Sequence, residues 1–230
     1  MIYGENIDEA AEELQHFKDS LRENLLQYTR QAFQVLQNMS KPRILDIGCG
    51  SGVPTLELAK LSGGEVIGID INQVQLERLN IKIVQRGLQH RVRTFNRSML
   101  SLDFPDNFFD IIWAEGSIAV IGFKKGLREW GRILKTGGYL VVHDDMGNLE
   151  KKTRLIPQYG YTLIHHFTLS NDVWSRYYYA PLEKKVNEIR EQYVSSKGIE
   201  ELLCGDQREI DGFGKDPERY RSVFFIMRKM

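Results

Sequence analysis

The sequence predicts a doubly wound α/β fold, because short apolar strands alternate with amphipathic helices along much of the chain. The segments with strand character are 43–47, 66–69, 91–95, 109–114, 139–143, 161–168 and 222–228. A helix between two consecutive strands is a crossover connection, which makes the strands run parallel. We therefore expect a seven-stranded, mostly parallel sheet with helices on both faces and an insertion before the last strand.

The predicted helices have apolar residues three or four positions apart and cover 7–38, 54–61, 72–86 and 123–134. Each is followed by residues that stop a helix: Asn38 to Pro42, Ser62-Gly63-Gly64, Gly87, and the turn 135–138. The polar and aromatic stretch 171–220 is predicted to be helical in parts. It lacks an apolar core pattern of its own, so it is interpreted as an insertion.

Composition limits the possible partners of the chain. Lys+Arg and Asp+Glu both number 31 in 230 residues, which argues against a broad electrostatic grip on nucleic acid or on an anionic membrane. The sequence has only two cysteines, too few for a disulfide framework. It shows neither a signal peptide nor a long apolar run. These features predict a cytoplasmic protein.

The most informative segment is Ile44 to Gly52, which reads ILDIGCGSG. A buried strand leads into three glycines at alternate positions and then into a helix. Glycines allow a tight turn with positive φ and a close approach to a ligand, and the helix offers its free N–H groups. A dinucleotide site prefers Gly-x-Gly-x-x-Gly, but Val53 occupies that third position here.

Two acidic residues accompany this turn. Asp46 lies inside the strand before the glycines, where a carboxylate suits a cationic, zwitterionic cofactor better than a pyrophosphate. Asp70 ends the strand in VIGID, at the sheet edge where such folds bind ligands, and can accept both ribose hydroxyls. The alternative role for Asp70 is to cap the helix that begins at Asn72.

ILDIGCGSG followed by VIGID resembles motif I and the acidic second-strand motif of class I S-adenosylmethionine-dependent methyltransferases, whose fold is Rossmann-like. FPDNFFDIIWAEGSIAVIG and LREWGRILKTGGYLVV resemble the fourth- and fifth-strand regions of that family, in its small-molecule type. The resemblance covers residues 43–143 and implies S-adenosyl-L-methionine as cofactor. It implies these cofactor-binding residues: Asp46, Gly48, Cys49, Gly50, Gly52, Asp70, Ile71, Gln75, Ser98, Met99, Glu115 and Gly116.

Within this resemblance, Asp70 would hold the ribose diol and Ile71 would lie against the adenine. Gln75 matches a glutamine that contacts the cofactor in some relatives; its alternative is an exposed helix residue. The chain departs from the family at Arg97-Ser98, where Asp-Ala is usual. Glu115 and Gly116 end the fourth strand beside the sulfonium, where Glu115 would orient a substrate or steady the charge, or simply cap a helix.

Methyl transfer from a sulfonium depends mainly on alignment, and a base is needed only for a protonated nucleophile. His143 at the end of the fifth strand is the candidate base, the alternative being a histidine packed beside the sheet. Asp144 and Asp145 follow it, but adjacent strand residues face opposite ways, so no metal site is expected. Trp174 and Tyr178 are proposed for a wall or lid over the acceptor, or for ordinary packing.

The predicted organisation is a single methyltransferase domain. It has an N-terminal helical cap (1–40), a cofactor-binding core (41–145) and a C-terminal substrate-side part (146–230) with the helical insertion at about 171–220. The expected partner is a small-molecule methyl acceptor, with no nucleic acid and no membrane, for a monomer or homodimer. The alternatives are a non-catalytic subunit that binds S-adenosylmethionine and, opposed by the glycine spacing, an NAD(P)-dependent oxidoreductase.

Overall fold

The computed structural model describes residues 2–37, 39–193 and 197–230, which form two compact units. The sheet unit comprises Leu26–Thr168 and Ser222–Met230. The helical unit comprises the described residues of Met1–Leu25 and Leu169–Arg221. Helix α1 (Ile2–Gln34) contributes residues to both units. Asn38, placed by the sequence analysis at the end of this helix, lies outside the described residues.

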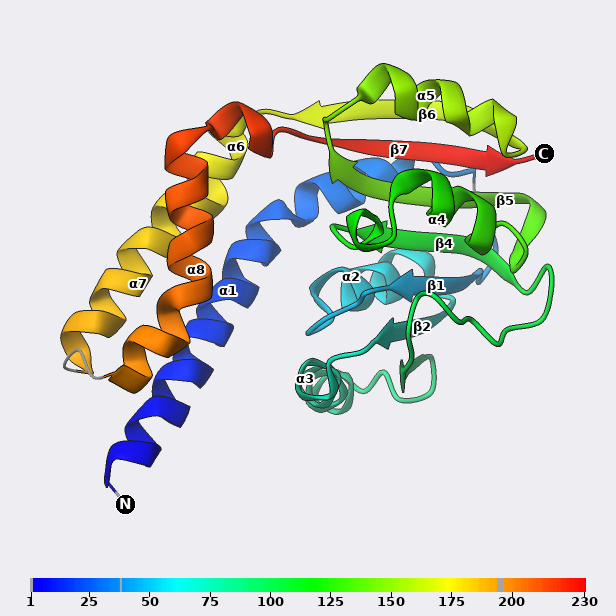
Figure 1. Cartoon of the computed structure of the whole chain (residues 1–230). Helices are drawn as coiled ribbons and strands as arrows, with labels where there is room; N and C mark the ends of the chain where they lie inside the picture. Colours follow the sequence, from blue (N-terminus) through cyan, green and yellow to red (C-terminus); the bar gives the residue numbers. More distant parts are fainter. Residues whose placement is uncertain (1, 38, 194–196) are drawn as a thin grey trace. The chain divides into compact units, whose positions relative to one another are not determined.

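The sheet has seven strands in the order β3-β2-β1-β4-β5-β7-β6 (Figure 1). The strands are β1 (Arg43–Ile47), β2 (Glu65–Asp70), β3 (Val92–Asn96), β4 (Phe109–Glu115), β5 (Leu134–Asp145), β6 (Tyr161–Leu169) and β7 (Ser222–Lys229). The pairs from β3 through β5 are parallel, and β7 runs antiparallel to β5. The predicted seven-stranded, mostly parallel Rossmann-like sheet is therefore confirmed.

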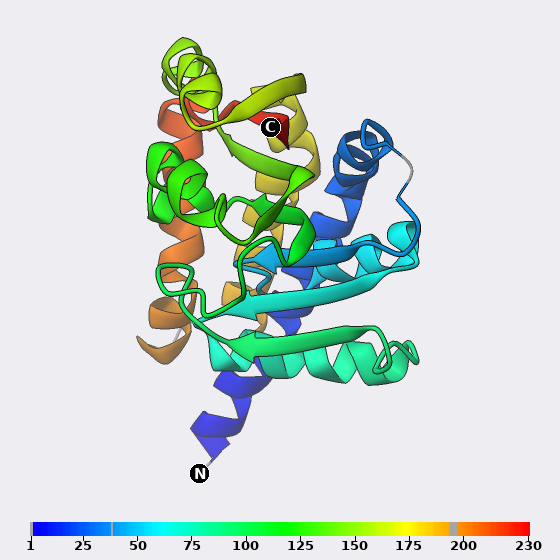
Figure 2. The same cartoon turned by 90° about the vertical axis from the view of Figure 1, so that its right-hand side faces the viewer.

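Helices cover both faces of the sheet, with α4 and α5 on one face and α2 and α3 on the other (Figure 2). They are α2 (Val53–Ser62), α3 (Gln73–Gln85), α4 (Phe123–Trp130) and α5 (Leu149–Gln158), with a short 3₁₀ turn η1 (Ile118–Val120). Coverage of both faces explains why the central strands are almost continuously apolar. The analysis of the sequence assigned no helix to the residues of α5.

The predicted helix 123–134 is too long. Helix α4 ends at Trp130, and β5 begins at Leu134. The predicted turn 135–138 is an irregularity inside that strand: Phe109 pairs with Leu134 and Ile111 with Tyr139, so the intervening β5 residues have no counterpart on β4. Gly137 takes φ +78° there, which a glycine adopts without steric cost.

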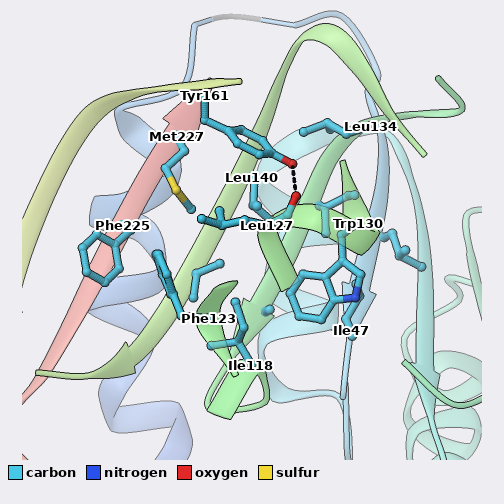
Figure 3. Packing of buried hydrophobic residues seen from close by; sticks show 14 of the residues in the cluster. Ile47, Ile118, Phe123, Leu127, Trp130, Leu134, Leu140, Tyr161, Phe225 and Met227 are labelled. Carbon is cyan, nitrogen blue, oxygen red and sulfur yellow. Dashed lines mark hydrogen bonds between the residues drawn. The ribbon is translucent and has the colours of Figure 1, made fainter. Parts of the chain in front are cut away.

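One hydrophobic core cluster of the sheet unit lies between the sheet and helices α4 and α5 (Figure 3). Trp130 and Phe123 of α4 pack with Phe225 and Met227 of β7, and all four are buried. The hydroxyl of Tyr161 donates to the carbonyl of Leu127 at 3.2 Å, which satisfies a polar group inside this core. This packing fixes the strand ends that carry the candidate site.

The helical unit contains α6 (Asn171–Trp174), the π-helical segment η2 (Ser175–Tyr179), α7 (Ala180–Gln192), α8 (Lys197–Lys215) and η3 (Pro217–Tyr220). The stretch 171–220 was predicted to have no apolar core pattern of its own, and its buried residues share one core with α1. Leu182, Val186 and Ile189 of α7 are fully buried with Leu14 of α1 and Leu203 of α8. Part of this core comes from α1, at the other end of the sequence, so the stretch 171–220 shows only part of the pattern. No described helix is long and apolar enough to cross a lipid bilayer.

Candidate active site

The turn after β1 brings the backbone of three glycines to the carboxyl edge of the sheet. Gly48 and Gly52 have φ of +74° and +83°, and a Cβ would lie 2.5 Å from Ser117 Cβ at the first and 2.1 Å from Leu79 Cδ1 at the second. Both positions therefore require glycine for conformation and for space. Gly50 also has positive φ, but no atom lies within 4 Å of its would-be Cβ. Its open side suits the close approach of a ligand.

Cys49, predicted to bind cofactor, directs its side chain into the protein. Its thiol lies against Gly68 of β2, where an added Cβ would be 2.9 Å from Sγ, and burial raises the pKa of the thiol. Its backbone N–H donates to the carbonyl of Ile69 at 3.0 Å. The side chain of Cys49 thus packs the turn against β2.

Asp46 is only 2% exposed and accepts a hydrogen bond from Thr55 Oγ1 at 2.6 Å. Burial raises its pKa to about 7, and the negative charges of Glu115 and Asp70 add to the effect. Asp46 is in register with Gly68 of β2 and Trp113 of β4, each two residues before the acid that ends its strand. The carboxylates of these three adjacent strands therefore lie at the same edge of the sheet.

Asp70 connects the glycine turn with the start of α3. One carboxylate oxygen accepts the N–H of Gly50 at 2.9 Å, and the other accepts the N–H of Asn72 at 2.8 Å. The role of N-cap is taken by Asn72, whose side chain accepts the N–H of Gln75. A carboxylate has about four acceptor positions, so Asp70 retains capacity for two hydroxyl donors.

Glu115 is half-buried at the end of β4. Its Oε1 accepts Thr29 Oγ1 at 2.9 Å and Trp113 Nε1 at 2.7 Å. Burial raises the pKa of Glu115 to about 7, although these two hydrogen bonds oppose the change. The sequence analysis missed both donors. The contact between Trp113 and Glu115 could have been predicted, because residues two apart on a strand share a face. No local sequence pattern connects Thr29 with β4.

The three carboxylates are held by neutral donors only. Within the part of the chain that the structure describes, no lysine or arginine forms an ion pair with Asp46, Asp70 or Glu115. Buried carboxylates are normally paired, so this edge of the sheet has an excess of negative charge that a cationic ligand would balance.

The remaining predicted residues surround this edge. Ile71 exposes 73% of its surface directly after Asp70, and Gln75 is half-buried on the first turn of α3. Ser98 accepts the N–H of Leu100, while Met99 packs on the core and approaches Gly48. Gly116 has φ +69°, and its N–H donates to the carbonyl of His143 at 3.0 Å.

His143 is paired with Glu115 in the β4–β5 register and is 9% exposed. Its Nε2 lies 2.8 Å from Ser222 Oγ, and its ring stacks on Phe224 with centroids 4.3 Å apart. Burial lowers its pKa to about 4, so the imidazole is neutral at physiological pH. These contacts agree with the alternative interpretation of His143 as a histidine packed beside the sheet. A neutral imidazole can nevertheless accept a proton.

Asp144 and Asp145 turn away from His143 and share Lys152 of α5, at 2.7 Å and 3.2 Å respectively. The alternation of strand side chains separates His143 from Asp144, but Asp145 reaches the same lysine because the strand ends there. Among the described residues, no group of three or more His, Cys, Asp or Glu side chains is arranged to hold a metal ion.

Trp174 and Tyr178 contribute to the core of the helical unit. Their rings make an edge contact with centroids 6.0 Å apart, and Tyr178 is 7% exposed within this unit. Tyr178 also contacts Tyr179, whose ring stacks on Phe213 of α8. The segment thus packs as aromatic core, as its alternative interpretation proposed, and its role toward a substrate stays a prediction.

These features define an α/β protein that has three carboxylates and an open glycine turn at the carboxyl ends of β1, β2 and β4. Residues 44–138 match the model of a methyltransferase domain family. This match supports the resemblance to class I S-adenosylmethionine-dependent methyltransferases that the motifs in residues 43–143 predicted.

Relatives and solved structures agree with this family. A sterol 24-C-methyltransferase of Gibberella zeae is 33% identical over 44% of this chain and 27% of its own length. The 27-O-demethylrifamycin SV methyltransferase of Amycolatopsis mediterranei is 30% identical over 62% of this chain and 52% of its own. The chain therefore spans about half or less of the curated relatives it matches.

Among solved structures, a Geobacter sulfurreducens SAM-dependent methyltransferase, in complex with S-adenosyl-L-homocysteine, superposes with a TM-score of 0.72. That likeness covers 88% of this chain and 90% of that chain, at 17% identity. At this level of identity the similarity establishes the fold.

Proposed function

We propose that this protein transfers a methyl group from S-adenosyl-L-methionine to a small molecule. The observation that carries the proposal is the set of three neighbouring carboxylates held only by neutral donors. The methyl donor carries a sulfonium, an ammonium and a carboxylate group, so its net charge is positive and opposes the negative charge of this edge of the sheet. A paired phosphate would add negative charge to it, which disfavours the dinucleotide alternative.

The residues present fit this cofactor. The open side of Gly50 admits a ligand against the backbone, and Asp70 has free acceptor positions for a ribose diol. The exposed side chain of Ile71 supplies an apolar surface for a purine, with Met99 and Ser98 near the same edge. Asp46 and Glu115 supply negative charge within the fold, where a low dielectric strengthens their effect.

When bound, the cofactor supplies an activated methyl group with a neutral leaving group. The protein contributes alignment, and correct positioning of reactants accounts for roughly 7–11 kcal/mol of a barrier. Glu115, fixed by Thr29 and Trp113, steadies the positive charge of the donor. His143 takes the proton of a protonated acceptor, which requires its Nε2 to exchange Ser222 for the substrate.

The acceptor class is a small metabolite, in keeping with the balanced charge of the chain and the small-molecule motifs. One relative, the 27-O-demethylrifamycin SV methyltransferase, is named for an acceptor of this class. Both cysteines are free, with Cys49 buried, which supports a cytoplasmic location. The protein acts as a monomer or homodimer.

The test is calorimetric titration of S-adenosyl-L-methionine and S-adenosyl-L-homocysteine into the wild type, Asp70→Ala and Asp103→Ala. Asp103 is an exposed carboxylate near the same edge and serves as the matched control. Loss of the Asp70 hydrogen bonds weakens donor binding by about 1–3 kcal/mol, and Asp103→Ala leaves it unchanged. Unchanged affinity in Asp70→Ala would remove this residue from the site.

A turnover assay distinguishes the proposed enzyme from the alternative, a non-catalytic subunit that binds the methyl donor. Release of S-adenosyl-L-homocysteine is followed with a panel of oxygen, nitrogen, sulfur and carbon nucleophiles. A methylated product identifies an enzyme. Tight donor binding without turnover across the panel identifies the binding subunit, while affinity for NAD(P) in place of the methyl donor would refute the proposal.

A further inference from the structure

A second ligand site is suggested by a pocket at the first turns of α4 and α5, two helices that lie next to each other in the sheet unit (Figure 1). The pocket has a volume of about 460 Å³. Its charged lining residues are all basic: Lys124, Lys125, Arg128, Lys151 and Lys152. Asp46, Asp70 and Glu115 do not line it, so it is distinct from the carboxylate edge.

Most of this positive charge is not neutralised. Lys152 is bound to Asp144 and Asp145, and Arg128 to Glu129. Over residues 2–37, 39–193 and 197–230, by contrast, no carboxylate lies within ion-pair distance of Lys124, Lys125 or Lys151. In a chain with no net charge, three unpaired ammonium groups around one hollow are a local excess that favours an anion.

The backbone at the pocket has the same polarity. The N-cap residues of α4 and α5, Gly122 and Asn148, both line the pocket, and neither side chain caps its helix. The free N–H groups and the positive ends of two helix dipoles therefore add to the charge of the lysines. This backbone contribution supplements the basic side chains, which carry the argument.

The rest of the lining is apolar and comes from Ile121, Phe123 and Leu155. The volume is within the range of roughly 300–1,000 Å³ that is typical of small-molecule sites, and it exceeds the space needed by one inorganic anion. We propose that this pocket binds an organic phosphate, whose phosphate contacts the lysines and whose carbon part lies on the apolar side chains.

The first experiment measures binding in the absence of any methyl donor, so its result does not depend on the proposed transferase activity. Phenyl phosphate and inorganic phosphate are titrated into the full chain by calorimetry. The pocket variant is Lys124→Gln/Lys125→Gln/Lys151→Gln. The control is Lys60→Gln/Lys184→Gln/Lys197→Gln, which removes the same charge from exposed lysines outside the pocket.

We expect saturable binding that is tighter for phenyl phosphate than for inorganic phosphate and weaker at high salt. The pocket variant should lose at least tenfold in affinity, and the control variant less than twofold. All six lysines are exposed, so both variants should keep the wild-type unfolding temperature. Equal weakening in both variants, or no saturable binding by the wild type, would overturn the proposal.

The phosphate can belong to the methyl acceptor or to a separate ligand. In the first case the pocket variant raises KM only for phosphorylated acceptors. In the second case phosphate changes the rate with an unphosphorylated acceptor, and the pocket variant abolishes that change. Each of these results assigns a source to the ligand of this pocket and supports the site.

Discussion

The carboxylates at the ends of β1, β2 and β4 differ from those at the end of β5 in what binds them. Asp46, Asp70 and Glu115 accept hydrogen bonds from hydroxyl, indole and backbone groups, none of which carries charge. Asp144 and Asp145 share the ammonium group of Lys152. Lys152 thus neutralises the carboxylates at the end of β5, whereas the charge of the other set is what the proposed cationic donor would balance.

The difference shows why a count of acids at a sheet edge does not identify a cofactor site. Raising the pKa of a carboxyl from 3.8 to about 7, as at Asp46, corresponds to roughly 4 kcal/mol against the ionised form. Carboxyl groups with such strongly raised pKa values are found preferentially at functional sites. The following predictions test this contrast, beginning with the largest expected effect.

The first prediction concerns the proposed role of His143 as a base, which would make β5 important for turnover and the other strands important for donor binding. His143→Ala should lower turnover about 100-fold, the scale of lost general-base catalysis, while donor affinity stays within twofold. Since the pKa of His143 is lowered to about 4, the wild-type kcat should show no histidine titration between pH 6 and 8. Steady-state kinetics and calorimetry measure both quantities. Equal losses in turnover and affinity would assign His143 to packing.

Removing charge from each set tests the contrast directly. Asp46→Asn keeps the shape and an acceptor for Thr55, yet should weaken donor binding by about 2 kcal/mol, or roughly 30-fold. Asp144→Asn, the matched change at β5, should leave donor affinity unaltered. Isothermal titration of both variants measures the two affinities, and similar losses would show that the two sets do not differ in function.

Donor binding should depend on pH with a sign set by the raised pKa values. Asp46 and Glu115 have pKa values of about 7 in the free protein, so they lose protons as pH rises from 6 to 8. A cationic donor binds the ionised form, and affinity should increase about tenfold over this range for each group that must ionise. Titrations in buffers of different ionisation enthalpy should reveal proton release at pH 7. Proton uptake would contradict the model.

The smallest expected effect concerns the hydroxyl that holds Glu115. Thr29→Val removes a hydrogen bond that lowers the pKa of Glu115, so donor affinity at pH 7 should fall by about 1 kcal/mol and recover at pH 8.5. Thr29→Ser keeps the hydroxyl and should bind like the wild type. A loss that is independent of pH would indicate a packing role for Thr29.

The sheet was predictable because its signals are local. Arg43–Ile47 is observed with the predicted bounds, and the helix predicted to begin at Asn72 is observed from Gln73, with Asn72 as its N-cap. The same local rules failed at Leu134, where the predicted helix continues into a strand. Residues 135–138 have turn chemistry, but an irregular pairing with β4 accommodates them inside β5.

Features that join distant segments were not predictable from one sequence. The helical unit is built from two segments, Met1–Leu25 and Leu169–Arg221, that precede and follow most of the sheet unit in the sequence. Neither segment alone shows the apolar pattern of the core that they form together. The partner of Glu115 on α1, Thr29, is 86 positions away, and the binding of Asp144 to Lys152 requires α5, which was not foreseen. The positive φ angles of the glycine motif, in contrast, are a requirement of the turn itself.

Gly48 and Ser117 share one small volume between two loops. A side-chain carbon at position 48 would meet Ser117 Cβ at 2.5 Å, and the serine hydroxyl already donates to the carbonyl of Ile47 at 2.6 Å. A side chain at position 48 would need a smaller residue at position 117 as well as a tolerated positive φ, so a change at position 48 depends on position 117. The contact between Gly48 and Ser117 thereby sets the spacing between the turn after β1 and the loop after β4.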